Sequence, residues 1–268
     1  SIEAKVIKEV IEDINLDVDL KKLNFSKNAE ILIAGCGTGQ HAITTASKYK
    51  NSEIFALDLS FNSLAYAKRK AEELNCKNIN FIQGDLLDLR KLDKKFDIIE
   101  SVGVLHHMAD PLLGWECLTD CLKKDALMLI GLYSEKARKN IINIRETINN
   151  LKIKTTKKNI INFRKDIFEN NNTKWESIKY SPDFYSTSGV RDLLFHVQEH
   201  RFTIKKIRSH MNKLGLIFLG FEDTYVLNQF KKKYGQTNDL YDLDKWEDFE
   251  KNNSRIFSGM YQFWCKKI

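Results

Sequence analysis

The sequence predicts an α/β fold, a doubly wound and mostly parallel sheet that carries a mainly helical insertion. Short apolar segments of strand length alternate with amphipathic segments of helix length, which gives five βα repeats in about 100 residues. This alternation is typical of a parallel sheet with helices on both faces and right-handed crossovers. It stops at residue 132, and residues 133–202 show helical patterns without a clear strand.

Length and composition are those of a globular protein. The chain has 268 residues, of which 43% are hydrophobic and 29% charged, enough for one large domain with a sizeable core. We expect no membrane span, because no window of about 18 apolar residues occurs. The first ten residues, SIEAKVIKEV, lack the apolar centre of a secretory signal. The five cysteines are scattered without a CxxC pair, which favours a reduced, cytoplasmic compartment.

The first half of the chain can be divided into expected elements in order. Apolar residues recur at helical spacing over residues 2–14, so the chain begins with an amphipathic helix. Ser60 and Asp110 are expected N-caps, and Pro111 suits a first helical position. The expected strands are 31–34, 53–57, 79–83, 96–101 and 126–132, and the helices between them are 41–49, 61–74 and 111–122.

The second half begins with the insertion and ends in a strand pair. Thr187 or Ser188 is the expected cap of a helix within the insertion. Thr203 is expected to cap a helix that ends at Gly215, and strands are expected at 216–221 and 260–265. We predict a single domain in four consecutive parts: an N-terminal helical cap, a central core, the insertion, and a last helix with two strands. They span residues 1–28, 29–132, 133–202 and 203–268.

The segment ILIAGCGTGQH, residues 31–41, places three glycines at the end of an expected strand. Glycine lets the backbone come close to a ligand, and the helix that follows directs its N–H groups at that ligand. In an open parallel sheet the ligand binds beyond the carboxyl ends of the strands. Gly35, Gly37 and Gly39 therefore predict a cofactor site. Their pattern is GxGxG and not the GxGxxG of dinucleotide binders.

Two acidic residues follow the next two strands. Asp58 ends the second strand in IFALDLS, where a carboxylate can accept hydrogen bonds from both hydroxyls of a ribose. Asp85 follows the third strand in FIQGDLLDL, where a carboxylate can accept from an adenine amino group. Three strand ends with matching chemistry form a stronger signal than the glycines alone.

The motifs AGCGTG, LDLS, QGDLLDL and FDIIESVGVLHHMADP resemble S-adenosylmethionine-dependent methyltransferases of the Rossmann-like class, over roughly residues 29–135. The resemblance implies seven strands with an antiparallel last strand, and S-adenosylmethionine as cofactor. The N-terminal helix, residues 2–14, is a candidate lid over the cofactor, with a packing helix or a dimer contact as alternatives. ILIAGCGTGQHAI and GMYQFW are also similar to bacterial methyltransferases often fused to tetratricopeptide repeats. The implied cofactor-binding residues are Gly35, Cys36, Gly37, Thr38, Gly39, Gln40, His41, Asp58, Leu59, Asp85, Leu86, Glu100 and Ser101.

One position departs from the family pattern. An acidic residue usually stands two positions before the first glycine of the motif, and here that position is Ile33. In the family this acid helps to order the methionine end of the cofactor. Gln40, His41 or Glu100 can supply polar contacts instead. The alternative is a site that no longer binds the cofactor.

The acceptor side of the site is less well defined by the sequence. His106 and His107 follow the fourth strand, and an imidazole can act as a base near neutral pH. Tyr185, in the insertion segment SPDFYSTSG, is a candidate for an acceptor contact in the substrate pocket that the insertion is expected to build. His196 and His200 have the spacing of a metal pair, but no third ligand stands out, so we expect no metal site.

The predicted function is methyl transfer to oxygen or nitrogen of a small molecule or of a peptide or protein side chain. An RNA methyltransferase is an alternative, because basic residues dominate from Lys136 to Lys165 and Glu146 is the only acid there. Nucleic-acid binding is not favoured, since aromatic residues do not interleave with these charges. A nicotinamide-dependent oxidoreductase and a non-catalytic binding module are the further alternatives. The sequence leaves the oligomeric state open.

Overall fold

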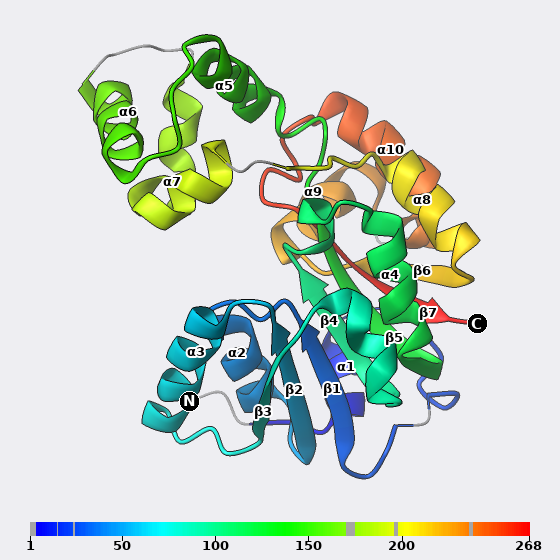
Figure 1. The fold of residues 1–268 in the computed structure, drawn as a ribbon. Helices are drawn as coiled ribbons and strands as arrows, with labels where there is room; N and C mark the ends of the chain where they lie inside the picture. The colour runs from blue at the N-terminus through cyan, green and yellow to red at the C-terminus, as the bar shows by residue number, and fades with distance from the viewer. Residues whose placement is uncertain (1–3, 15, 24, 170–174, 196–197, 236–237) are drawn as a thin grey trace.

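The computed structural model describes residues 4–14, 16–23, 25–169, 175–195, 198–235 and 238–268. Within these residues seven strands form one sheet in the order β3-β2-β1-β4-β5-β7-β6 (Figure 1). Strand β7 is antiparallel to both of its neighbours, and the other paired strands run parallel. This confirms the predicted fold class. The strands are β1 (Ala29–Ala34), β2 (Ser52–Asp58), β3 (Ile79–Gln83), β4 (Phe96–Val102), β5 (Leu122–Leu132), β6 (Leu216–Phe221) and β7 (Tyr261–Lys267).

Helices cover both faces of the sheet. Buried side chains of α1, α2 and α3 pack on one face, and those of α4, α8, α9 and α10 pack on the other. Strands buried on both faces require continuous apolar segments, which is why β1 reads as AEILIA. The helices are α1 (Ile7–Ile14), α2 (Gln40–Lys48), α3 (Phe61–Glu73), α4 (Pro111–Asp120), α5 (Lys139–Asn150), α6 (Lys157–Glu169), α7 (Thr187–Leu194), α8 (Ile204–Lys213), α9 (Thr224–Tyr234) and α10 (Leu243–Asn252).

Helix caps show how local sequence sets the helix boundaries. Ser60, Asp110 and Thr203 cap α3, α4 and α8 through side-chain oxygens that accept backbone N–H hydrogen bonds, as predicted. The predicted cap of α7 is wrong. Ser186 has the extended backbone of a cap and its side chain accepts from the Gly189 N–H, while Thr187 is already helical.

The segment between β6 and β7 contains more structure than the sequence reading predicted. Helices α9 and α10 lie there, capped by Asp223 and Asp242. Trp246 of α10 stacks on Phe230 of α9 with ring centroids 3.9 Å apart, and both side chains are fully buried. The sequence contained the signals for both helices, namely a capping aspartate before each helix and apolar residues at helical spacing.

The insertion is helical, as predicted, and has its own small core. Helices α5, α6 and α7 bury Ile144, Ile160, Phe163 and Val190 in a cluster separate from the two that flank the sheet. In Figure 1 these helices lie beyond the carboxyl ends of the parallel strands. None of the helices within the described ranges combines the length and the apolarity needed to cross a membrane.

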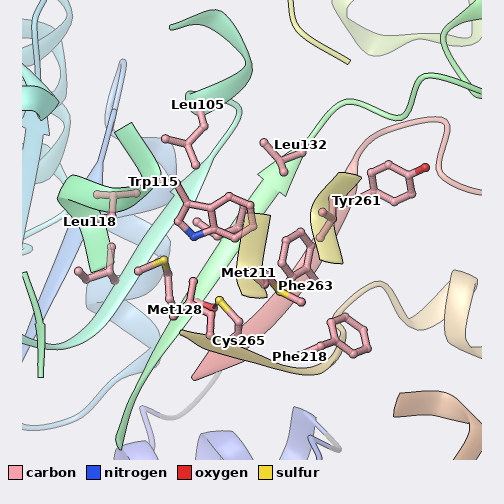
Figure 2. Packing of buried hydrophobic residues seen from close by; sticks show 14 of the residues in the cluster. Leu105, Trp115, Leu118, Met128, Leu132, Met211, Phe218, Tyr261, Phe263 and Cys265 are labelled. Carbon is pink, nitrogen blue, oxygen red and sulfur yellow. Dashed lines mark hydrogen bonds between the residues drawn. The ribbon is translucent and has the colours of Figure 1, made fainter. Parts of the chain in front are cut away.

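The larger cluster on the α4 side contains Phe263 of β7, which is fully buried among Trp115, Phe218 and Phe221 (Figure 2). We predict that Phe263→Ala lowers the free energy of unfolding by about 3–5 kcal/mol, because it removes buried apolar surface and leaves a cavity. Urea unfolding followed by circular dichroism measures this change.

The control for this prediction is Ile217→Ala on the edge strand β6, where the side chain is 44% exposed. It should cost about 1 kcal/mol, clearly less than Phe263→Ala, because nearly half of its surface stays in water in the folded protein. An equal loss for both variants would contradict the placement of Phe263 in the core.

Candidate active site

The glycine-rich turn between β1 and α2 has the backbone geometry that only glycine adopts easily. Gly35, Gly37 and Gly39 have φ angles of 80°, 52° and 87°. A Cβ atom on Gly35 would lie 2.3 Å from Val104, and one on Gly39 would lie 2.5 Å from Ala67. A Cβ on Gly37 would meet nothing within 4 Å. The turn is thus packed at both ends and open at its centre, where a ligand can approach the backbone.

Asp58 holds this turn against the end of β2. One carboxylate oxygen accepts from the Gly37 N–H at 2.7 Å, and the other accepts from the Ser60 N–H at 2.9 Å. Leu59 beside it is 66% exposed. Asp85 after β3 accepts from the Leu87 N–H at 2.9 Å and so caps the short helix Leu86–Leu92.

A cavity of about 570 Å³ lies next to the glycine turn, within the size range of ligand sites. We call it the turn cavity. Predicted site residues that line it are Gly35, Cys36, Gly37, Thr38, Gln40, His41 and Glu100. Its other lining residues are Thr44, Thr45, Lys48, Val102, Leu129, Glu222 and Gln262. The structure does not bring the predicted residues Gly39, Asp58, Leu59, Asp85, Leu86 and Ser101 into this lining.

Glu100 is the buried carboxylate of the turn cavity. It is 3% exposed, accepts from the Thr45 hydroxyl at 2.8 Å, and lies 2.5 Å from Nε2 of His41. In the parallel register of β1 and β4, Glu100 is the partner of Ile33. A carboxylate is therefore present beside the position where the family motif usually has its acid, but it comes from the neighbouring strand.

The turn cavity also contains polar residues that the sequence reading missed. Lys48 and Thr45 lie on the same helix as His41, and Glu222 directly follows β6. Burial raises the pKa of Glu222, with Glu100 adding to the rise and Lys48 opposing it. The sequence could have marked Glu222 as a site residue, because it is an acidic residue at the end of an expected strand, as Asp58 is.

A second cavity, of about 480 Å³, lies between the insertion and the edge of the sheet. We call it the insertion cavity. Its lining residues are Tyr133, Ala137, Arg138, Asn140, Ile141, Ile178, Ser181, Asp183, Leu193, Arg255, Ser258, Gly259 and Met260. Tyr185 is outside this lining; its side chain is 62% exposed, and its hydroxyl donates to the Lys179 carbonyl at 2.8 Å.

The two histidines after β4 take part in packing. His106 is fully buried, and its ring stacks on Tyr133 with centroids 3.8 Å apart. Its carbonyl accepts from the His200 N–H at 2.7 Å, and Nδ1 of His107 lies 3.1 Å from the Gln198 carbonyl. His196 lies outside the described residues, and no group of metal ligands occurs within them.

The basic segment from Lys136 to Lys165 contributes several side chains to the interior. Lys136 pairs with the buried Glu250 at 3.1 Å. Arg138 and Arg145 both pair with the buried Glu199 at 2.7 Å. Because these cations form ion pairs with buried carboxylates, fewer cations of this segment are available to bind the phosphates of a nucleic acid.

The His41–Glu100 pair predicts a pH dependence of stability. Burial lowers the pKa of His41, but the hydrogen bond and the charge of Glu100 outweigh it, so the pKa of His41 is raised. Stability from this pair is fully present below the ordinary histidine pKa of about 6.5 and is lost as pH rises through the raised value. The thermal unfolding temperature of the wild type should exceed that of His41→Gln most at low pH.

His210→Gln is the matched control, because burial lowers the pKa of His210. Stability from a neutral buried histidine is lost as pH falls, so its difference from the wild type should grow with pH. The same trend for both variants would contradict the pairing of His41 with Glu100.

The sequence is similar to those of known methyltransferases. The family model described as a methyltransferase domain matches residues 25–186. An uncharacterized protein of Synechococcus sp. is 29% identical over 231 residues, which are 82% of this chain and 55% of that protein. A probable (S)-tetrahydroprotoberberine N-methyltransferase of Papaver bracteatum is 27% identical over 128 residues, which are 48% of this chain and 35% of that protein.

A solved structure shows the same fold. PKMT2 from Rickettsia typhi, in complex with AdoHcy, is similar with a TM-score of 0.63 at 18% identity, over 91% of this chain and 50% of that chain. The chain thus spans about half the length of these relatives or less. The family match covers more than half of the chain and contains the glycine turn, Asp58, Asp85 and Glu100. The chain therefore belongs to the methyltransferase domain family.

Proposed function

We propose that this domain transfers the methyl group of S-adenosylmethionine to oxygen or nitrogen of a small molecule or of a peptide or protein side chain. The observation that carries the proposal is the open glycine turn at Gly37, tied to Asp58 and bordered by a cavity with the buried carboxylate Glu100. Membership of the methyltransferase domain family supports it. So does PKMT2, the similar fold solved in complex with AdoHcy.

The residues at the sheet edge fit this cofactor. Each oxygen of Asp58 accepts one backbone N–H and keeps a lone pair for a ribose hydroxyl. Asp85 has the same chemistry for an adenine amino group. Glu100 and Glu222 place two carboxyl groups in the turn cavity, which suit the ammonium and the sulfonium of the methionine end, while Lys48 and His41 of the same lining offset part of their charge. When bound, the cofactor supplies a methyl group that is already activated on sulfur.

We assign the acceptor to the insertion cavity. Gln262 lines the turn cavity, and Met260, two residues earlier, lines the insertion cavity. The two cavities therefore have lining residues two positions apart at the same edge of the sheet, and in-line transfer requires such proximity. Because the ring of His106 is fully buried, this proposal gives His106 a packing role in the wall of the site. His107 and Tyr185 are outside the lining of the insertion cavity, so the proposal gives neither of them a contact with the acceptor.

One relative supports nitrogen as the acceptor atom. The Papaver bracteatum relative is named as an N-methyltransferase. The sequence resemblance to methyltransferases often fused to tetratricopeptide repeats remains a proposal about the subfamily of this domain. A screen of amines, alcohols and peptides, with release of S-adenosylhomocysteine as the readout, would identify the acceptor class.

Calorimetric titration tests the cofactor. We expect micromolar binding of S-adenosylmethionine and S-adenosylhomocysteine, and no binding of NADH. Asp58→Ala should weaken this binding by about 1–3 kcal/mol, because a charge-assisted hydrogen bond to the ribose is lost. Glu73→Ala, which removes an exposed carboxylate paired with Lys70 on α3, is the control and should leave affinity unchanged.

Two outcomes would contradict the proposal in different ways. No binding of any ligand by the wild type would favour the non-catalytic module. Normal binding by Asp58→Ala, with the wild type also binding, would remove only the ribose role of Asp58.

A further inference from the structure

We propose that Tyr133 contacts the acceptor directly and that its hydroxyl hydrogen-bonds to the atom that receives the methyl group. This inference rests on the proposed function and names a residue that the sequence motifs do not mark. Tyr133 is the first residue after β5 and lines the insertion cavity. It therefore stands at the carboxyl edge of the sheet, where ligands bind in this class of fold.

The backbone of Tyr133 is fixed from outside its own strand. Its carbonyl accepts from the Phe202 N–H at 2.9 Å, and the Phe202 carbonyl accepts from the Glu135 N–H at 2.9 Å. The next residue, Ser134, donates its hydroxyl to the buried Glu250 at 2.8 Å. The chain cannot shift at this point without breaking buried hydrogen bonds, which keeps the Cα position of Tyr133 constant.

The ring of Tyr133 is held between two planar groups. The guanidinium carbon of Arg138 lies 3.6 Å from the ring centroid, and the imidazole of His106 stacks at 3.8 Å with an interplanar angle of 28°. Two groups this close to one centroid would collide on the same face, so they occupy opposite faces. Contact on both faces prevents the ring from changing rotamer.

Both of these groups are themselves held by one segment, residues 198–202. Glu199 accepts from Nε of Arg138 at 3.0 Å and from its Nη2 at 2.7 Å. The bidentate geometry fixes the plane of the guanidinium as well as its position. The carbonyl of His106 accepts from the N–H of His200. Side chains locked in this way are typical of residues that position a reacting group.

The hydroxyl of Tyr133 remains available to a ligand. It makes no hydrogen bond to the residues that the structure describes, whereas the hydroxyl of Tyr261 donates to Glu250 at 2.5 Å. Burial raises the pKa of Tyr133, and Arg138 opposes this with a smaller effect. The phenol is therefore protonated at neutral pH, and it can donate one hydrogen bond and accept another.

Such a hydroxyl matches an amine or alcohol acceptor and does not match a carbon acceptor. By accepting the N–H or O–H hydrogen bond, Tyr133 directs the acceptor's lone pair toward the methyl group. The new bond joins nitrogen or oxygen to the methyl carbon, the carbon–sulfur bond breaks, and sulfur keeps its electron pair as a thioether. The acceptor's proton leaves to water, so Tyr133 is neutral before and after transfer.

The test uses Tyr133→Phe, which keeps the ring and removes only the hydroxyl. The probes are S-adenosylhomocysteine and sinefungin, an analogue in which carbon replaces the sulfur and an amine takes the place of the transferred methyl group. We expect Tyr133→Phe to weaken sinefungin binding about tenfold and S-adenosylhomocysteine binding less than about twofold, because only the amine reaches the hydroxyl. Calorimetry measures both affinities.

Tyr234→Phe is the matched control, since its hydroxyl donates to Asp248 at 3.0 Å on the α9–α10 side of the domain. It should leave both affinities within about twofold of the wild type, because this bond lies outside both cavities. A second variant, Arg138→Lys, removes the bidentate contact and the planar stacking group. It should also lower the preference for sinefungin, with the fold verified by circular dichroism.

The outcomes separate the two levels of the proposal. If the wild type binds neither probe, the proposed function fails and this inference fails with it. If the wild type binds both, and Tyr133→Phe binds sinefungin as tightly as the wild type does, only the role of Tyr133 is overturned. Equal weakening of both probes would mean that Tyr133 supports the cofactor site and does not contact the acceptor.

Discussion

Parallel pairing of β1 with β2 and β4 is the constraint on which the site depends. Because the strands run the same way and pair in register, their carboxyl ends finish at one edge. The glycine turn, Asp58 and Glu100 come from β1, β2 and β4 and lie near that edge, although they are far apart in the sequence. The same register places Glu100 beside Ile33, so the neighbouring strand provides the carboxylate that the motif lacks.

Buried carboxylates connect the parts of the domain. Glu100 connects β4 to α2 through Thr45 and His41, and Glu199 connects the loop before α8 to Arg138 and Arg145. Glu250 connects α10 to the segment after β5 and to β7 through hydrogen bonds and an ion pair. Burying a charge is costly unless it is paired. Each carboxylate therefore favours the arrangement of neighbouring segments that keeps its partners in contact with it. We interpret these pairs as setting the geometry of the two cavities more than the overall stability.

The fold alone does not define a reaction, since the same sheet supports many functions. What distinguishes this domain is the insertion, whose helices close a cavity against the carboxyl edge of the sheet. Its polar wall from Arg138, Asp183 and Arg255 and its apolar wall from Ile141, Ile178 and Leu193 are provided by segments with little resemblance to a motif. The proposed function therefore assigns acceptor choice to the part of the chain that sequence patterns describe least.

The sequence by itself determined the strands of the sheet, the glycine turn and most of the capped helices, because each depends on residues within one or two turns of chain. Helices α9 and α10 belong to the same class, since Asp223 and Asp242 mark them locally. Tertiary structure alone decided that His106 is buried under Tyr133 and that Arg138 meets Glu199, 61 residues away. Contacts between residues so far apart in the sequence depend on how helices and strands pack against one another, and a local sequence pattern does not predict this packing.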